Sequence, residues 1–467
     1  MNIILQNYND LLKKVIFDTF SQNLKENLNN IDASGNVMNY VNLLSSLDDS
    51  LCEIAKNTLV TTFEAINHSY SISHDRKKKY DIKSHHERSI LTIFGEITFK
   101  RTFFKSKLNG KLYCHVDRLL GLHKYDYFDP YLKAIVTSYA SNNSYHKVAS
   151  YLNDLIGNRV SINDKFNYFS RQTVRNIIMS SIFSNQKPVI KDTPSSIYII
   201  ADEKWIHTQN NKGKDVMMKS IVVFEGIHNH KLINKHVFAS LDYSFLSCSL
   251  DYIYNTYDTD KIKCVYLMGD GASWIKNLRN YFQFNKNIKV IYGLDKFHFK
   301  QALHHLCLDK VLEAIVESYV IHNNKFDFNK ICDSLLLKHH HCSDTIVNKQ
   351  NYILNNWKYI INLYKYGLSC PMESQISHNL ADLFTSRPKA YSVKTIVKLT
   401  ELRLLFKNKF NIKKLFLHNF NSKELLTINT KNLNFNIFDR QYNNSNIMNL
   451  IYEPFYSIPY DNSYHSA

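Results

Sequence analysis

The sequence predicts an α/β core built on a mixed β-sheet, preceded by a mainly helical N-terminal region and carrying an all-helical insertion. Two patterns lead to this prediction. Apolar residues recur at the three- and four-residue spacing of amphipathic helices through residues 1–70 and again through 130–183. From residue 195 onward, short apolar runs typical of buried strands alternate with amphipathic stretches. Such an alternation after a helical region indicates a separate α/β domain.

The N-terminal part of the chain divides into two predicted regions. Residues 1–80 form a helical region that ends on the basic cluster Arg76–Lys79. Residues 81–184 begin with a stretch that alternates apolar and polar residues on both sides of Gly95. This alternation predicts two short strands or one kinked ribbon, and helical periodicity returns afterwards.

Two helices within the second region resemble a helix-turn-helix, which places its second helix in the major groove of DNA. The first helix carries four apolar residues on one face, as packing against another helix requires: Tyr145, Val148, Ala149 and Leu152. Ser170 is placed to cap the second helix. Three polar side chains then lie near its exposed N-terminal end and are candidates for DNA contact: Arg171, Gln172 and Arg175. Two packed surface helices would fit the same pattern equally well.

A linker that holds two prolines, residues 185–196, leads into a predicted α/β domain over residues 195–410. Its strands are expected at residues 196–208, 217–228, 235–242, 263–271 and 287–295, and its helices at 243–257, 272–282 and 296–307. Three sequential antiparallel strands followed by two parallel strands, each reached through a crossover, is the RNase H-like order.

Two further segments complete the predicted organisation. The chain is helical and polar from about residue 300 to 370, which indicates an insertion within the α/β domain. Residues 411–467 are rich in Asn, Tyr and Ser with weak periodicity, and are therefore predicted to form a loosely ordered tail.

Two acids stand where apolar strands end: Asp202 follows SIYIIA, and Asp270 follows VYLMG. In the predicted order the first and fourth strands are parallel neighbours, so both acids are expected at the same edge of the sheet. Two carboxylates held that close repel each other unless a cation lies between them. Hard divalent cations prefer oxygen ligands, which favours Mg²⁺ or Mn²⁺ over zinc.

A third carboxylate from a later helix would complete a site for two such ions, suited to in-line displacement at phosphorus. Glu373 is the candidate, because Pro371 is well placed to begin a helix with Glu373 in its first turn. The predicted site therefore consists of Asp202, Asp270 and Glu373, both as catalytic residues and as metal ligands.

Each acid also has an ordinary structural explanation. An Asp after a strand often caps a helix, and a Glu in a first helical turn often only complements the helix dipole. Glu203 is a competing ligand, but strand alternation should point it to the opposite face from Asp202. Asp295 could support the site or cap the helix that follows it, and Trp274 is interpreted as helix packing, with stacking on a flipped base as the alternative.

Composition limits the class of protein. The chain has 58 Lys and Arg against 41 Asp and Glu, a net charge of +17 that favours a polyanionic partner, although a coding bias toward Lys and Asn would also raise it. The eight cysteines form no CxxC pair, which is typical of a reducing cytosol. Apolar runs are too short to span a membrane, so we expect a cytoplasmic protein. Neither a P-loop nor GxGxxG occurs, so we expect no nucleotide cofactor.

Several stretches, in order from about residue 85 to 405, resemble the ISLre-type bacterial insertion-sequence transposases, an uncharacterised protein family distantly similar to mutator-type DDE transposases. These are RSILTIFGEITFKRTFF, DRLLGL, ADEKWIHTQ, GDGASWIK, LDKFHFKQAL and MESQISHNLADLFTSRPKAYS. GDGASWIK followed by LDKFHFKQAL is the most specific, because neither belongs to a common structural motif.

The resemblance implies an RNase H-like DDE transposase that binds the terminal inverted repeats of its element and transfers 3′-hydroxyls to target DNA with two Mg²⁺ or Mn²⁺ ions. It carries the acidic triad onto Asp202, Asp270 and Glu373. Synapsis of two ends implies a homodimer or larger assembly, located at the bacterial nucleoid when bound to DNA. Candidates for DNA contact in or beside the matched stretches are Lys276, His298, Lys300 and Arg387.

Two alternatives remain open. The same carboxylates could serve an RNase H-like nuclease without strand transfer, or the chain could be a catalytically inactive DNA-binding remnant. The second alternative rests on a departure from the family pattern: relatives usually have Gly after the first Asp, whereas this chain has Glu203 and Lys204.

Overall fold

The computed structural model describes residues 37–157, 168–183, 189–209, 215–229, 231–307, 309–368, 384 and 390–424, together with Lys13, Phe17 and Ser21. The chain separates into two units, Met1–Asn419 and Phe420–Ala467. The elements described below belong to the first unit, apart from the end of the last helix.

A long helix, α2 (Val37–Ile72), packs against the ribbon formed by β1 (Tyr80–Thr92) and β2 (Gly95–Ser106). The ribbon predicted around Gly95 is confirmed as two antiparallel strands, and Gly95 adopts a φ of +116° at the turn between them. The short helix α3 (His74–Lys79) joins α2 to β1, while β3 (Leu112–Cys114) and α4 (His115–Leu119) follow the ribbon.

Side chains of α2 cover part of the open edge of β2. Glu64 accepts a hydrogen bond from the Lys100 amide at 2.9 Å, and Asn67 accepts one from the Thr102 amide at 3.0 Å. Apolar residues of α2 also join the core that includes Phe99. The helix and the ribbon share one core, and side chains of α2 satisfy backbone amides of β2, so these contacts cross the predicted boundary between residues 80 and 81.

Helices α5 (Pro130–Ala140), α6 (Tyr145–Gly157) and α7 (Arg171–Ser180) pack against one another. Their shared core contains fully buried aliphatic side chains from all three helices: Leu132, Val136, Leu152, Ile156, Val174 and Ile178. The predicted apolar face of the first helix of the pair is thus buried as expected, and α5 adds a third helix to the pair.

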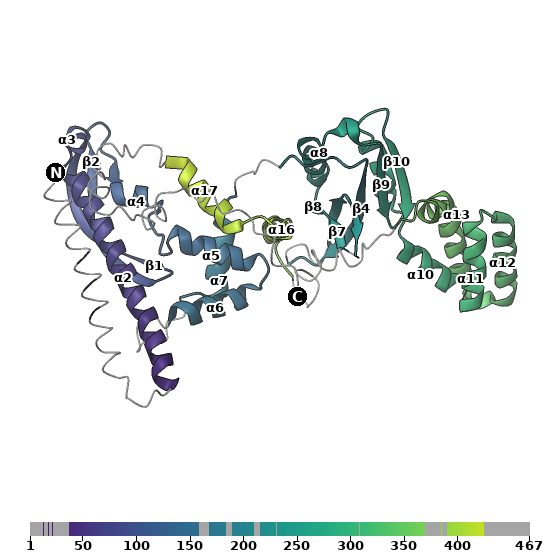
Figure 1. The fold of residues 1–467 in the computed structure, drawn as a ribbon, viewed down its shortest axis with the longest axis horizontal. Helices are drawn as coiled ribbons and strands as arrows, with labels where there is room; N and C mark the ends of the chain where they lie inside the picture. Colours follow the sequence, from purple (N-terminus) through teal and green to yellow (C-terminus); the bar gives the residue numbers. More distant parts are fainter. Residues whose placement is uncertain are drawn as a thin grey trace. The chain divides into compact units, whose positions relative to one another are not determined.

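The α/β domain contains a five-stranded mixed sheet (Figure 1). Its strands are β4 (Ser196–Ile206), β5 (Val216–Phe224), β8 (His236–Ser240), β9 (Cys264–Gly269) and β10 (Lys289–Leu294). They lie in the order β8-β5-β4-β9-β10; β5 is antiparallel to β4 and β8, whereas β9 is parallel to β4 and β10. The predicted pairing of the first and fourth strands is confirmed.

One predicted strand differs from the structure. The expected strand over residues 217–228 ends at Phe224, and Gly226–His228 forms a separate strand, β6, paired with β7 (Lys231–Ile233). Glu225 interrupts the strand after β5, and the residues that follow it form a small separate hairpin. The local apolar pattern does not distinguish such a hairpin from a longer strand.

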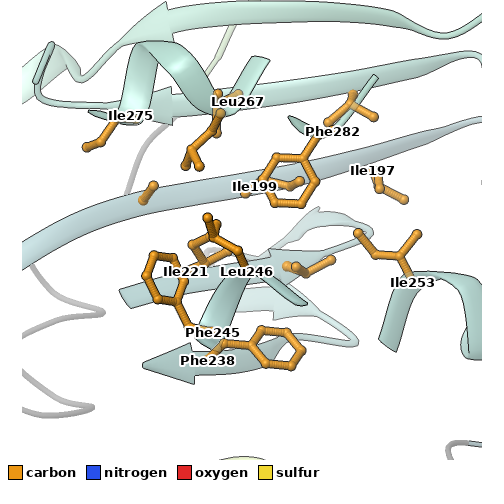
Figure 2. Packing of buried hydrophobic residues seen from close by; sticks show 14 of the residues in the cluster. Ile197, Ile199, Ile221, Phe238, Phe245, Leu246, Ile253, Leu267, Ile275 and Phe282 are labelled. Atoms are coloured by element: carbon orange, nitrogen blue, oxygen red, sulfur yellow. The ribbon is translucent and has the colours of Figure 1, made fainter. Parts of the chain in front are cut away.

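The two faces of the sheet have separate cores because side chains alternate along each strand. On one face, Ile197, Ile199 and Ala201 of β4 pack against α8 (Ser244–Thr256) and α9 (Ser273–Tyr281). Figure 2 shows part of this core, with Phe245, Leu246 and Ile253 of α8 and Ile275 of α9 among the labelled side chains. On the other face, Ile200 packs with Met268, Leu363 and Leu368.

Four helices form the stretch predicted as an insertion: α10 (Lys296–Cys307), α11 (Lys310–Ile321), α12 (Lys325–Lys338) and α13 (Ser343–Lys365). They enclose a core of their own that includes Phe299, Phe328 and Ile353. Helix α13 also contacts β10, so this helical unit is attached to the sheet through packing as well as through the chain.

Helices α16 (Val393–Lys407) and α17 (Ile412–Glu424) follow. Asn408, just after α16, bonds both backbone groups of Val237 on β8 at 2.8 and 2.9 Å. The described part of the stretch from residue 411, predicted as a loosely ordered tail, includes α17, in which Leu415 and Phe416 are buried.

Gly269→Ala should destabilise the sheet at its centre. A Cβ at this position would lie 2.8 Å from a methyl carbon of Ile275 and 3.0 Å from the backbone oxygen of Ala201, which cannot move without shifting β4. We expect the free energy of unfolding to fall by about 1–3 kcal/mol in urea denaturation. Gly226→Ala is the matched control, since its Cβ would meet nothing closer than 3.7 Å; equal losses in both variants would contradict this explanation.

Candidate active site at the ends of strands β4 and β9

The parallel pairing of β4 and β9 places two acids at one edge of the sheet. The last residue pair of this ladder is Ile200 with Met268, after which β9 ends at Gly269 while β4 continues to Ile206. Asp202 and Asp270 each stand two residues beyond that pair. Both side chains are half-buried, so they are open to solvent from the edge of the sheet.

The two carboxylates interact electrostatically. The pKa of Asp202 is raised to about 6, first by burial and then by the nearby negative charge of Asp270, although the Glu203 amide donates a hydrogen bond to Asp202 at 2.7 Å that lowers it. Burial and like charge both disfavour the ionised form. A cation between the two carboxylates would remove this repulsion, so the donor set suits a hard divalent ion.

The backbone after β9 is held from several sides. The Asp270 carboxylate accepts a hydrogen bond from the Ala272 amide at 2.8 Å, and the Tyr352 hydroxyl of α13 donates to the Asp270 carbonyl at 2.8 Å. Gly271 adopts a φ of +96°, a conformation that L side chains rarely take, and its amide donates to the Tyr292 hydroxyl at 3.0 Å. These contacts fix the direction in which the Asp270 side chain leaves the sheet.

Beside the carboxylates, buried Asp295 pairs with half-buried His298. Asp295 is 2% exposed, and its amide donates to the Gly269 carbonyl at 2.7 Å, which places it next to the end of β9. Its carboxylate bonds Nδ1 of His298 at 2.8 Å. The pKa of His298 is raised, chiefly by that bond and also by the charges of Asp270 and Asp202. The interpretation of Asp295 as a cap is confirmed, because its carboxylate accepts a hydrogen bond from the Phe297 amide at 3.3 Å; the other carboxylate oxygen orients His298.

Glu203 points to the opposite face from Asp202, as strand alternation predicts. Its carboxylate accepts a hydrogen bond from the indole nitrogen of Trp274 at 2.6 Å, and Trp274 in turn packs against the core beneath α8 and α9. The interpretation of Trp274 as a packing residue is confirmed. Glu203 does not compete with Asp202 as a ligand on the other face.

The remaining predicted residues are distributed around the molecule. Lys276 lies close enough to Asp270 for the carboxylate to raise its pKa, but burial lowers the pKa more. Lys300 forms an ion pair with Glu317 at 2.5 Å, which neutralises its charge. Arg171 and Gln172 are exposed at the start of α7, and Arg175 is half-buried. Glu373 and Arg387 lie outside the described residues.

Among the residues that the structure describes, no three His, Cys, Asp or Glu side chains are grouped to hold a metal ion. Asp202 and Asp270 thus supply two carboxylates, and the third predicted ligand, Glu373, belongs to the part of the chain outside that description. The described helices include none long and apolar enough to cross a membrane.

Fold and site together define an α/β protein with paired carboxylates just beyond the point where the pairing of two parallel central strands ends. Residues 33–379 match the sequence profile of an uncharacterised protein family, UPF0236. The chain therefore belongs to this family.

Curated relatives come from one organism, Caldanaerobacter subterraneus subsp. tengcongensis. UPF0236 protein TTE0402 is 24% identical over 85% of this chain and 81% of its own length, and UPF0236 protein TTE2489 is 24% identical over 79% of each. A third, also 24% identical, carries eleven locus designations in its name. The family thus has many paralogues in a single genome.

Asp202→Asn should make the metal-free protein more stable at neutral pH, because it removes a half-buried charge facing Asp270. The folded pKa of about 6 lies above the ordinary value of 3.8, so the native state binds this proton more tightly than the unfolded state. Wild-type stability therefore decreases as pH rises from about 4 to about 6 and remains lower above that range.

We expect the melting temperature of Asp202→Asn in EDTA to exceed that of the wild type at pH 7.5, and the two to converge near pH 4.5. Differential scanning fluorimetry across this range measures both. A variant that is less stable than the wild type at pH 7.5 would show that the two carboxylates do not repel each other as described.

Proposed function

We propose that this protein is a DNA transposase of the DDE type, similar to the ISLre-type insertion-sequence transposases, that cleaves DNA and joins 3′-hydroxyls to target DNA. The observation that carries the proposal is the placement of Asp202 and Asp270 beyond the last residue pair of the parallel strands β4 and β9. Opposed carboxylates at such a strand end are suited to metal-dependent phosphoryl transfer.

The topology supports an RNase H-like assignment for the α/β domain. Numbered along the chain, its five strands lie in the order 3-2-1-4-5, with only the second strand antiparallel to the rest. Helices cover both faces, and a helical unit separates the fifth strand from the segment that carries Glu373. Each of these features agrees with the architecture that the resemblance implies.

The chain on either side of Glu373 supports its role as the third carboxylate. Leu368 packs with Ile200 and Met268, and Phe384 packs with Ile206 and Met218, so both anchors lie on the face of the sheet toward which β4 points Asp202. Glu373 is five residues from Leu368, a span of at most about 18 Å. The length of this segment is compatible with Glu373 as the third carboxylate.

Asp202, Asp270 and Glu373 would hold two Mg²⁺ or Mn²⁺ ions, which when bound supply activation of water or a 3′-hydroxyl and stabilisation of the leaving oxygen. The protein's own contribution is positioning. The hydrogen bonds at Asp270 fix one carboxylate, and the Glu203 amide fixes the other. His298, oriented by Asp295, is placed to contact a phosphate at the same edge.

Helix α7 supplies the proposed contacts to terminal inverted repeats. Ser170 accepts a hydrogen bond from the Thr173 amide at 3.0 Å, which confirms the predicted cap and fixes where the helix begins. The side chain of Asn153 on α6 bonds both backbone groups of Phe169 at 2.9 Å, so the approach to α7 is anchored to its neighbour. Arg171 and Gln172 then project from an end that is rigidly supported.

The genomic distribution of relatives agrees with a mobile element. A protein encoded at many positions of one genome is expected when the gene is copied along with the DNA that its product moves. We propose that this chain acts in the bacterial cytoplasm on DNA, as a homodimer or larger assembly that brings two element ends together.

Asp202→Asn, Asp270→Asn and Glu373→Gln should each reduce metal-dependent cleavage of end DNA by about 1000-fold or more, because each removes a ligand oxygen charge from one shared site. Labelled element ends incubated with Mg²⁺ or Mn²⁺ measure cleavage and strand transfer. Mn²⁺ should also raise the melting temperature of the wild type, and this rise should shrink in all three variants. Asp333→Asn, an exposed carboxylate on α12, is the matched control and should behave as the wild type.

The outcomes separate the alternatives. Cleavage that persists in Asp270→Asn or Glu373→Gln would reject the site assignment. Cuts without joined products would indicate a nuclease, and wild-type protein that binds ends without cutting them would indicate an inactive remnant.

Arg171→Ala and Gln172→Ala should each weaken binding to end DNA by about 5- to 100-fold, since each removes a contact from the exposed start of α7. Fluorescence anisotropy over a range of salt concentrations measures both affinity and the number of phosphate contacts. Lys310→Ala and Lys330→Ala remove single exposed positive charges from α11 and α12 and serve as controls. Equal effects in the controls would indicate that general charge, and not α7, determines binding.

A further inference from the structure

Beside the carboxylates, on the opposite face of β4, lies an exposed group that we call the aromatic patch: Trp205, Lys219 and Tyr243. Trp205 is 53% exposed and Tyr243 is 57% exposed. The function proposed above does not use these residues.

Contacts beneath the patch hold it in place. Glu203 is opposite Lys219, and Trp205 is opposite Met217, in the ladder between β4 and β5. The Lys219 ammonium lies 3.9 Å from the ring centroid of Tyr243 and 5.5 Å from that of Trp274. Because the Trp274 indole is itself bonded to Glu203, it forms a fixed inner layer under the exposed group.

The patch depends on the same strand ending as the active site. β9 pairs with β4 only as far as Ile200, so β4 beyond that residue has β5 as its neighbour on one side and no partner strand on the other among the described residues. Trp205 stands three residues after Asp202, a rise of about 10 Å along the strand. This distance corresponds to roughly three nucleotides at the 3.4 Å spacing of a DNA strand.

We propose that the aromatic patch binds an unpaired nucleobase of the DNA strand whose phosphate lies at Asp202 and Asp270. Trp205 offers a flat face for stacking, and Lys219, whose ammonium lies over the Tyr243 ring, offers a cation to the adjoining phosphate. Asp202 and Trp205 lie on opposite faces of β4, so a base reaches Trp205 only by turning away from its own helical stack across the edge of the sheet. An exposed indole on the same sheet face as a lysine suits a nucleotide better than an apolar peptide.

This inference rests on the proposed function and adds a substrate requirement to it: unpaired nucleotides close to the reacting phosphate. Trp274 is excluded from the role because Glu203 and the core occupy it. The structure thus favours Trp205 as the stacking residue over the tryptophan that the sequence motif suggested.

The test compares the binding of blunt duplex ends with that of ends carrying a short unpaired stretch, in EDTA so that no cleavage occurs. We expect Trp205→Ala to lose about 5- to 100-fold affinity for the unpaired ends and to bind blunt duplex as the wild type does. Trp205→Phe, which keeps a stacking face, should retain most of the affinity. Tyr243→Ala should show a smaller loss in the same direction.

Intrinsic fluorescence gives a second measurement. The chain has three tryptophans, of which Trp357 is 3% exposed and Trp274 is bonded to Glu203, so quenching by an added single-stranded oligonucleotide should report mainly on Trp205. We expect this quenching to disappear in Trp205→Phe although the oligonucleotide still binds.

Phe326→Ala is the matched control, because Phe326 is 77% exposed on α12, away from the patch residues in sequence and element. Wild-type affinity of Trp205→Ala for unpaired ends would overturn the proposal, as would an equal loss for blunt and unpaired DNA, which would indicate a duplex contact instead. Both results are binding measurements, so they also test the proposal in a protein that binds DNA without cutting it. Failure of the proposed function would show separately, as absent metal-dependent cleavage.

Discussion

The parallel pairing between β4 and β9 determines the arrangement of the whole site. The ladder stops at Ile200 and Met268, where Gly269 permits the backbones to approach so closely that a single methyl group would collide with the Ala201 oxygen. The end of this ladder positions both acids. Asp202 lies on β4, which continues beyond the ladder, and Asp270 lies on the turn that follows β9. The electrostatic repulsion between Asp202 and Asp270 therefore follows from the geometry of the sheet. A cation bound between the two carboxylates would relieve it.

The helical unit α10–α13 has a direct part in the site. Tyr352 donates to the carbonyl of Asp270, and the buried side chain of Asn356 lies beside Gly271, at the turn that directs the carboxylate. At the other end of the same unit, Asp295 joins the sheet edge to His298 on α10. The helical unit α10–α13 therefore has a core of its own and also orients the backbone at Asp270 in the candidate site.

Strand β4 separates two kinds of chemistry by alternation alone. Residues that point to one face continue from Ile200 to Asp202, and residues that point to the other continue from Ala201 to Glu203 and Trp205. The acidic edge and the aromatic patch can thus lie within a few residues of each other without contact between them. The proposed DNA substrate would have to cross the edge of the sheet to contact both the acidic edge and the aromatic patch. For this reason we propose that one base leaves its helical stack.

The sequence by itself determined the periodic features of this protein: the five central strands and their pairing, the ribbon around Gly95, the cap at Ser170, and the placement of Asp202 and Asp270 on neighbouring parallel strands. Each of these features follows from a local sequence pattern that determines one element or the order of the strands. The tertiary structure alone decided which distant groups meet, such as α2 with the ribbon, His298 with the carboxylates, and Trp274 with Glu203. Contacts of that kind depend on how helices pack and turns direct the chain, and the spacing of residues along a sequence carries no record of them.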